Sequence, residues 1–193
     1  RSSDVYDKWV KLFGGKCFSE PSELAETCDV VFICVGRDED VLEVTSGKNG
    51  IFHTIKPGSL IVDHSTTSAN LSRELGAIAN QLNCNFIDAP VSGGERGAID
   101  GKLAIMCGGS SESFNLAKSI MDCYAAKISL MGPHGSGQLC KMVNQICIAG
   151  LLQGLSEGVN FAKNAGLDVE QVIEIISKGA AQSWQLDNRA VTM

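Results

Sequence analysis

The chain has 193 residues, of which 44% are apolar and 20% charged, and its formal net charge is −6. This size and composition predict a soluble globular protein with a substantial core in one or two domains. Lys and Arg are scattered singly along an acidic chain, which argues against a nucleic-acid or anionic-membrane partner. No stretch reaches the roughly 18 apolar residues of a membrane span, and no signal peptide is visible.

The eight cysteines and three histidines follow neither the spacing of a metal site nor that of a disulfide framework. No Cys-x-x-Cys pair occurs, and most of the cysteines lie within apolar patterns. We interpret them as small buried hydrophobes in a reducing compartment, such as the cytoplasm or an organelle matrix. Neither a disulfide nor a zinc site is expected.

Helical and strand patterns alternate through the first two thirds of the chain. Helices are expected at residues 4–13, 19–27, 38–44, 69–82 and 112–124. Strands are expected at residues 16–18, 30–35, 60–63, 85–88, 103–107 and 128–131. The run at residues 30–35 is continuously apolar and β-branched, which is typical of a strand covered on both faces. Because strands alternate with helices, the fold class is α/β with a doubly wound, mainly parallel sheet.

The last third of the chain is helical, with helices expected at residues 138–165 and 169–177. The chain begins at Arg1 rather than at a methionine, and no clear terminal signal marks Met193. We therefore expect an incomplete α/β domain at residues 1–131 and the start of an all-helical domain at residues 132–193.

Ligands of doubly wound sheets bind outside the carboxyl ends of the strands, so the loops after the strands are candidates for a binding site. Three of these loops are rich in small and polar residues: residues 35–37, 64–67 and 89–97. The second loop is also suited to capping the following helix, and the third to an ordinary turn. Capping does not exclude binding, because free amides at a helix start donate to ligands. Ser92, Gly93 and Gly94 would form a nest for a carboxylate.

A glycine-rich turn at residues 132–137 leads into the longest helical pattern. Apolar residues cover most faces of this helix, which predicts that it is buried. Lys141 lies near its start, where lost hydration would lower the pKa of the ammonium group and suit it to proton transfer. The alternative is a lysine that extends to solvent along the apolar surface. Asn144 and Gln145 are the i+3 and i+4 neighbours of Lys141, so a lysine and a carboxamide can converge on one small substrate.

Four motifs occur in order along the chain. They are Val-Asp-His-Ser-Thr at residues 62–66, Asp-Ala-Pro-Val-Ser-Gly-Gly at 88–94, Gly-Ala-Ile-Asp-Gly at 97–101, and Gly-Ser-Gly-Gln-Leu-Cys-Lys at 135–141. Together they resemble the β-hydroxyacid dehydrogenases, a family that includes 3-hydroxyisobutyrate dehydrogenase, tartronate semialdehyde reductase and, more distantly, 6-phosphogluconate dehydrogenase. The resemblance covers the whole chain, and the second and fourth motifs in combination are highly specific.

The resemblance implies a partial Rossmann-type NAD(P)-binding domain at residues 1–131 and part of an all-α domain from residue 132. It also implies an enzyme that interconverts a small β-hydroxy acid and its semialdehyde or keto acid by hydride transfer. NADP or NAD would be the cofactor, no metal would be needed, and a homodimer or homotetramer is expected. Relatives of this kind open with a Gly-x-Gly-x-x-Gly turn that this chain lacks, so roughly thirty further residues are expected in front of it.

Individual roles follow from the same resemblance. Lys141 matches the catalytic lysine, with Asn144 or Gln145 as the amide that orients the substrate, and the carboxylate loop matches Ser92, Gly93 and Gly94. The cofactor contacts fall at Arg1, Val35, Gly36, Asp40 and Thr66. Because the guanidinium of Arg1 could pair with a ribose 2′-phosphate, NADP is expected to serve at least as well as NAD.

Three alternatives remain at this point. A non-catalytic relative kept as an assembly module would be expected to lose Lys141, and an imine-reducing relative to carry another group there. A 6-phosphogluconate dehydrogenase-like substrate would need further basic residues, most of which would lie outside this chain.

Overall fold

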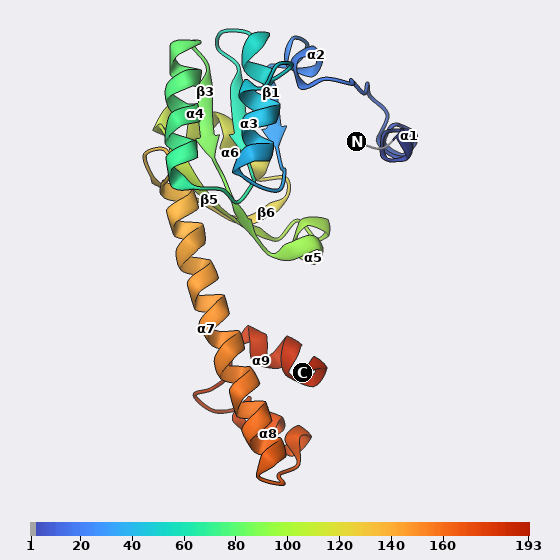
Figure 1. Cartoon of the computed structure of the whole chain (residues 1–193), viewed down its shortest axis with the longest axis vertical. Coiled ribbons are helices and arrows are strands. Elements are labelled where there is room, and N and C mark those ends of the chain that lie inside the picture. Colours follow the sequence, from blue (N-terminus) through green and yellow to red (C-terminus); the bar gives the residue numbers. More distant parts are fainter. Residues whose placement is uncertain (1–2) are drawn as a thin grey trace. The chain divides into compact units, whose positions relative to one another are not determined.

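The computed structural model describes residues 3–193, and the chain divides into two compact units, with the boundary in the sequence between Lys141 and Met142. The first unit is α/β and the second is helical (Figure 1). The two units are joined by a continuous helix, α7, which spans Ser136–Asn164.

Within the described residues the strands form one six-stranded sheet in the first unit. The strands are β1 (Val30–Ile33), β2 (Leu60–Asp63), β3 (Asn85–Asp88), β4 (Val91–Ser92), β5 (Leu103–Gly109) and β6 (Ala125–Gly132). β1, β2 and β3 are parallel neighbours, and β5 is parallel to β6. β5 runs antiparallel to both β3 and β4. The sheet is therefore mainly parallel, as expected, with β5 as the strand at which the direction reverses.

Helices surround this sheet and make up the second unit. In the first unit they are α1 (Ser3–Phe13), α2 (Pro21–Ala25), α3 (Asp38–Ser46), the 3-10 turn η1 (Ile51–His53), α4 (Ala69–Gln81), α5 (Gly94–Ile99) and α6 (Ser111–Met121). In the second unit α8 (Val169–Ile176), α9 (Trp184–Arg189) and the 3-10 turn η2 (Ala190–Thr192) follow α7. Side chains of Ser68, Ser110, Asp168 and Ser183 cap α4, α6, α8 and α9 by accepting a first-turn amide.

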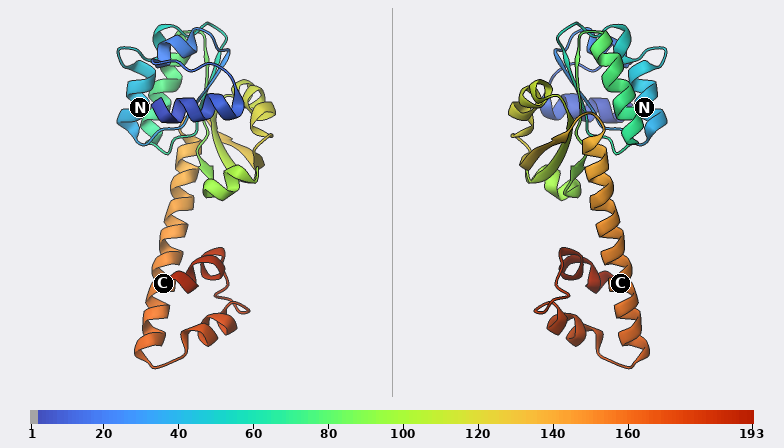
Figure 2. Two further views of the ribbon diagram at one scale, coloured as in Figure 1. Left: turned by 90° about the vertical axis from the view of Figure 1, so that its right-hand side faces the viewer. Right: turned by 90° about the vertical axis from the view of Figure 1, so that its left-hand side faces the viewer.

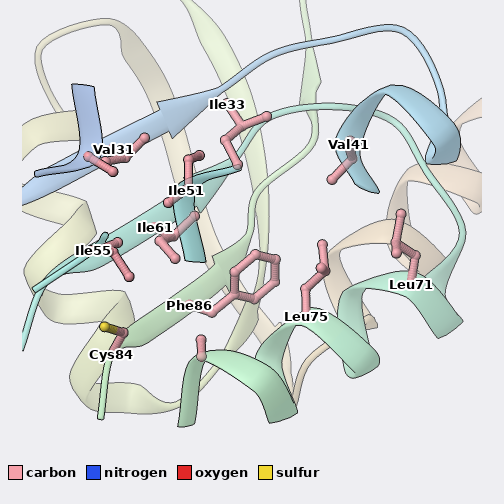
Figure 3. Close-up of a cluster of buried hydrophobic side chains, with 12 residues drawn as sticks. Val31, Ile33, Val41, Ile51, Ile55, Ile61, Leu71, Leu75, Cys84 and Phe86 are labelled. Atoms are coloured by element: carbon pink, nitrogen blue, oxygen red, sulfur yellow. The ribbon is translucent and has the colours of Figure 1, made fainter. Parts of the chain in front are cut away.

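Two apolar clusters cover the two faces of the sheet. One face packs side chains of β1, β2 and β3, such as Ile61 and Phe86, against Val41 of α3 and Leu75 of α4 (Figure 3). The opposite face packs alternate residues of the same strands and of β5 against α6. Figure 2 shows α3 and α4 on one side of the sheet and α6 on the other. This arrangement follows from the period-2 alternation of side chains along a strand, and it is the doubly wound architecture predicted.

Some expectations from the sequence are wrong. Residues 16–18 form no strand, because these residues are largely exposed and no neighbouring strand pairs with them. The long helix is not buried: Val143 is 61% and Ile146 72% exposed, since the described residues supply few side chains that cover this part of α7. Four of the eight cysteines are exposed rather than buried, namely Cys17, Cys34, Cys123 and Cys147, while only Cys84 and Cys107 are buried.

Candidate active site

The carboxyl ends of β1, β2 and β3 lie side by side, with Ile33, Asp63 and Asp88 in register across the three strands. Two of the loops that follow are fastened to each other. The Val35 amide donates to Ser65 Oγ at 2.9 Å, and the Ser68 amide donates to Asp38 Oδ1 at 2.9 Å. Two of the loops predicted to bind a ligand are thus joined by hydrogen bonds of their own.

Thr66 is the exposed residue of a loop whose neighbours are buried. Gln138, which is fully buried in the first turn of α7, bonds on both sides of it: its Oε1 accepts from the Thr67 amide at 3.1 Å, and its Nε2 donates to Ser65 O at 2.8 Å. The Ser65 amide donates in turn to Asp63 Oδ1 at 2.9 Å. Thr66 is therefore an exposed residue on a backbone that is held on both sides.

Asp88 fastens the start of α7 to the end of β3. Its Oδ1 accepts from the Gly135 amide at 2.8 Å and its Oδ2 from the Gln138 amide at 3.1 Å, and no part of the residue is exposed. A carboxylate at this end of a helix also interacts favourably with the helix dipole. Burial raises the pKa of Asp88, and the two amides oppose that rise. A Cβ on Gly137 would meet Met106 O, and Asp88 O at 2.8 Å, so the helix start approaches the sheet as closely as only glycine permits.

Lys141 lies one turn beyond Gln138 on α7 and is only 9% exposed. Burial lowers the pKa of its ammonium group, as the sequence predicted. Among residues 3–193, no acidic side chain forms an ion pair with it. The lysine is therefore a buried amine without a compensating charge, which is the setting that suits a proton-transfer group.

Asn144 and Gln145 belong to the second unit. Asn144 is half-buried and Gln145 is exposed, and Asn144 Nδ2 donates to Gln145 Oε1 at 3.0 Å. Their shared role in orienting a substrate stays a prediction.

The predicted carboxylate loop lies between β4 and α5. Ser92 ends β4, Gly93 precedes α5, and Gly94 begins it. Both glycines have positive φ, 139° and 62°, a conformation that side chains disfavour. Sequence reasoning treated residues 89–97 as one loop and missed this short strand and helix.

Two further residues predicted to contact the cofactor, Gly36 and Asp40, lie in the first unit. Gly36 is exposed, and a Cβ at this position would meet Asp40 Oδ2 at 2.8 Å. Asp40 lies in α3, where its Oδ2 is 3.7 Å from Arg37 Nε. Arg1 lies outside the described residues.

Gln138, Asp88 and Asp63 were not assigned by sequence reasoning, although the structure makes them the polar framework of these loops. Burial raises the pKa of Asp63 to about 6, against the opposing effect of the hydroxyl and amide of Ser65. Its Oδ2 and the Thr67 hydroxyl are buried and have no hydrogen-bond partner among the residues that the structure describes. One signal was available for Gln138, because it precedes Lys141 by three residues and must share a helix face with it.

Within the part of the chain that the structure describes, no three His, Cys, Asp or Glu side chains gather as a metal site would require. Nor does any helix of residues 3–193 have the length and apolar content to cross a membrane.

Residues 1–132 match the family described as the NAD binding domain of 6-phosphogluconate dehydrogenase. Residues 135–193 match the family described as NAD-binding of NADP-dependent 3-hydroxyisobutyrate dehydrogenase. An uncharacterized oxidoreductase of Shewanella frigidimarina is 52% identical over 96% of this chain and 64% of its own length. The mitochondrial 3-hydroxyisobutyrate dehydrogenase of mouse is 33% identical over 95% of this chain and 56% of its own length.

Among solved structures, the chain is similar to 3-hydroxyisobutyrate dehydrogenase of Mycobacterium tuberculosis with L-serine, with a TM-score of 0.87 and 26% identity. This likeness covers 97% of this chain and 64% of the other. The chain thus spans less than two thirds of the length of these relatives. On these matches, which cover the α/β unit and the helical unit alike, the chain belongs to the β-hydroxyacid dehydrogenase family of NAD(P)-dependent oxidoreductases.

Proposed function

We propose that the full-length protein interconverts a small β-hydroxy acid and its semialdehyde or keto acid, with Lys141 as the group that exchanges the proton of the reacting oxygen. The observation that carries the proposal is the placement of Lys141: a buried amine with a lowered pKa and no ion pair among the described residues, one turn from the glutamine that holds the Thr66 loop. Burial lowers the pKa of this amine, and a lower pKa makes its proton easier to release, which favours exchange of a proton with the substrate oxygen.

The residues present fit a nicotinamide dinucleotide in two respects. Gly36 is exposed, and a side chain there would meet Asp40 Oδ2, while Thr66 is an exposed residue on a loop that Gln138 holds in place. Val35, Gly36, Asp40 and Thr66 would hold the cofactor, which supplies or accepts the hydride when bound. NADP is expected to serve at least as well as NAD.

The chain's own residues would do the rest. The amides and hydroxyl of the segment Ser92–Gly94 would hold the substrate carboxylate, which fixes the carbon that faces the cofactor. In oxidation Lys141 would accept the proton of the substrate hydroxyl, and in reduction it would return a proton to the oxygen. Asn144 or Gln145, one turn further along α7, would orient that oxygen. A homodimer or homotetramer is the expected assembly.

The substrate class is tested by a spectrophotometric panel on the full-length protein with each nicotinamide cofactor. The panel contains 3-hydroxyisobutyrate, tartronate semialdehyde and L-serine, the last because the Mycobacterium tuberculosis relative was solved with it. Each carries a carboxylate and an oxygen on the β-carbon. Turnover of none of these compounds, or of a cyclic imine instead, would contradict the proposal and favour an assembly module or an imine reductase.

The role of Lys141 is tested by Lys141→Met, which keeps the length of the side chain and removes the proton. The turnover number kcat should fall by about 10²–10⁴-fold, the usual contribution of a general acid–base, while cofactor affinity changes little. Lys163→Met is the matched control, because Lys163 lies on the same helix and its ammonium donates an exposed hydrogen bond to the Met193 carbonyl at 3.4 Å. If Lys141→Met keeps kcat within about threefold of wild type, well short of that range, the lysine is not the proton-transfer group.

A further inference from the structure

His64 is the first residue after β2, and its imidazole joins three segments of the first unit. Nδ1 lies 2.6 Å from the carbonyl oxygen of Ala89, the first residue after β3. Nε2 lies 2.8 Å from the hydroxyl of Tyr124, which immediately precedes β6. His64 itself belongs to the loop that contains Thr66, and its ring bonds to Ala89, at the start of the segment that leads to Ser92.

The direction of both hydrogen bonds follows from their partners. A carbonyl oxygen can only accept, so Nδ1 must carry the proton, and in a neutral ring Nε2 is then the acceptor of the Tyr124 hydroxyl. Burial lowers the pKa of His64, and burial raises the pKa of Tyr124 to about 12. Both groups are therefore neutral near pH 7, and a single tautomer satisfies all the donors and acceptors.

Aromatic neighbours also hold the ring in place. Phe32 of β1 stacks on His64 with ring centroids 5.6 Å apart, and the Tyr124 ring stands perpendicular to the imidazole at 5.8 Å. A ring that is packed on two sides cannot turn away from the Ala89 carbonyl without losing both contacts. The hydrogen bond to Ala89 is thus enforced by packing as well as by the tautomer.

The two loops that meet at His64 differ in what else supports them. Gln138, Asp63 and Val35 all bond within residues 63–67. Among the described residues, His64 is the only side chain that hydrogen-bonds to the backbone of residues 89–94, whose other hydrogen bonds are backbone pairs. Loss of the imidazole should therefore loosen the segment that leads to Ser92–Gly94 and leave the Thr66 loop in place.

We propose that His64 is a positioning residue for the substrate-carboxylate loop, that it acts through the Ala89 carbonyl, and that Tyr124 keeps it in the required tautomer. This inference rests on the proposed function for its kinetic readout, and hydrogen exchange provides a second readout that does not.

Three variants of the full-length protein separate the parts of the proposal. His64→Leu removes both hydrogen bonds, and Tyr124→Phe removes only the hydroxyl. His64→Asn is the conservative variant, because an asparagine amide can donate from about the position of Nδ1. His53→Asn is the matched control: His53 also bonds a backbone carbonyl, that of Gly47 at 2.9 Å, but at an exposed position.

In His64→Leu, KM for the hydroxy acid should rise about tenfold, the effect of roughly one hydrogen bond, while the Kd of NADP stays within about twofold. KM for the hydroxy acid should be close to wild type in His64→Asn, and in Tyr124→Phe it should lie between the values of His64→Asn and His64→Leu. In His53→Asn it should equal that of wild type. Amides of residues 91–94 should exchange with deuterium faster in His64→Leu and not in His53→Asn, whether or not the protein turns over any compound of the panel.

Three results would overturn the proposal: unchanged exchange of residues 91–94 in His64→Leu, an equal rise in KM for the acid and in Kd for NADP, or equal losses in His64→Asn and His64→Leu. The last of these would mean that ring packing, and not the hydrogen bond, is what matters. A wild-type protein that turns over no acid would instead contradict the proposed function, and the exchange measurement alone would then decide the role of His64.

Discussion

Replacement of Gln138 by leucine should destabilise the first unit and loosen the Thr66 loop. The side chain is fully buried and satisfies two backbone groups, the Thr67 amide and the Ser65 carbonyl. Leucine has a similar size but no polar atoms, so both backbone groups would be left buried without a partner. Each such group costs about 1–3 kcal/mol, and the apolar side chain recovers part of this, which gives a net loss of about 2–4 kcal/mol.

A carboxylate at the same position makes the expected result depend on pH. In Gln138→Glu one oxygen can still accept from the Thr67 amide, while the other faces the Ser65 carbonyl and must carry a proton to bond it. Burial and this hydrogen bond both favour the neutral acid, so the pKa of the new side chain should be raised. A raised pKa in the folded state means that stability is lost as pH rises, so Gln138→Glu should approach wild type at pH 5 and fall below it at pH 8.

Urea denaturation of wild type and variants at these two pH values measures both effects, and a cofactor titration of the leucine variant reports on the loop. Gln153→Leu is the control, because Gln153 lies on the same helix and its side-chain amide donates to the exposed Glu157 carboxylate. If Gln138→Leu loses no more stability than Gln153→Leu, the hydrogen bonds to Ser65 and Thr67 do not stabilise the fold by the amount expected. A glutamate variant whose stability relative to wild type is the same at both pH values would refute the argument that the buried glutamate is protonated.

Two further perturbations address the same framework. Gly137→Ala should cost more than about 3 kcal/mol of stability or prevent folding, because its Cβ would meet backbone oxygens of Met106 and Asp88. Gly150→Ala lies on the same helix with open space at its Cβ and should stabilise the protein by up to about 1 kcal/mol. Thermal melts that rank the two variants in the reverse order would contradict this expectation. Asp63, with its pKa raised from 3.8 to about 6, holds a proton in the folded state that the unfolded chain releases, so it makes stability fall as pH rises between those values. Compared with wild type, Asp63→Asn should gain about 2 kcal/mol between pH 4.5 and pH 7 in urea titrations, and parallel pH profiles of the two proteins would show that Asp63 is not the group responsible.

Local patterns were enough to predict most helices and strands. The strands at residues 60–63 and 85–88 have the bounds that the sequence indicated, because each is a short apolar run between turn residues. The direction of a strand was harder to predict from the sequence. Nothing in residues 103–107 indicates that β5 runs antiparallel to β3, since direction depends on how the chain returns to the sheet rather than on the residues of the strand.

The wrong prediction of a buried α7 has a similar cause. Apolar side chains such as Val143 and Ile146 show that a helix face tends to be covered, but they do not show by what. Burial depends on partners, and within the described residues few side chains cover this face. The exposed Cys147 of the same helix was predicted to be buried for the same reason.

The candidate site was predictable in its loops and not in its framework. Glycines, serines and threonines after strands mark places that a ligand can approach, and the structure places Val35 and Thr66 on loops that bond to each other. The polar residues that hold these loops are harder to find, because a buried Gln138 or Asp88 has the same sequence signature as a solvated one. Only tertiary contacts distinguish them.

The framework has a consequence for how the lysine is placed. Lys141 lies six residues after Gly135, about 9 Å along the axis of α7 at 1.5 Å per residue. The start of this helix is fixed to β3 by Asp88 and to the Thr66 loop by Gln138. Any substitution that shifts the helix start by 1 Å, on the order of the misplacement that costs a reaction about 10²-fold, moves the amine by the same amount. If Lys141 transfers the proton as proposed, the reaction should be sensitive to residues that never touch the substrate, because Asp88 and Gln138 set the position of the helix that carries the lysine.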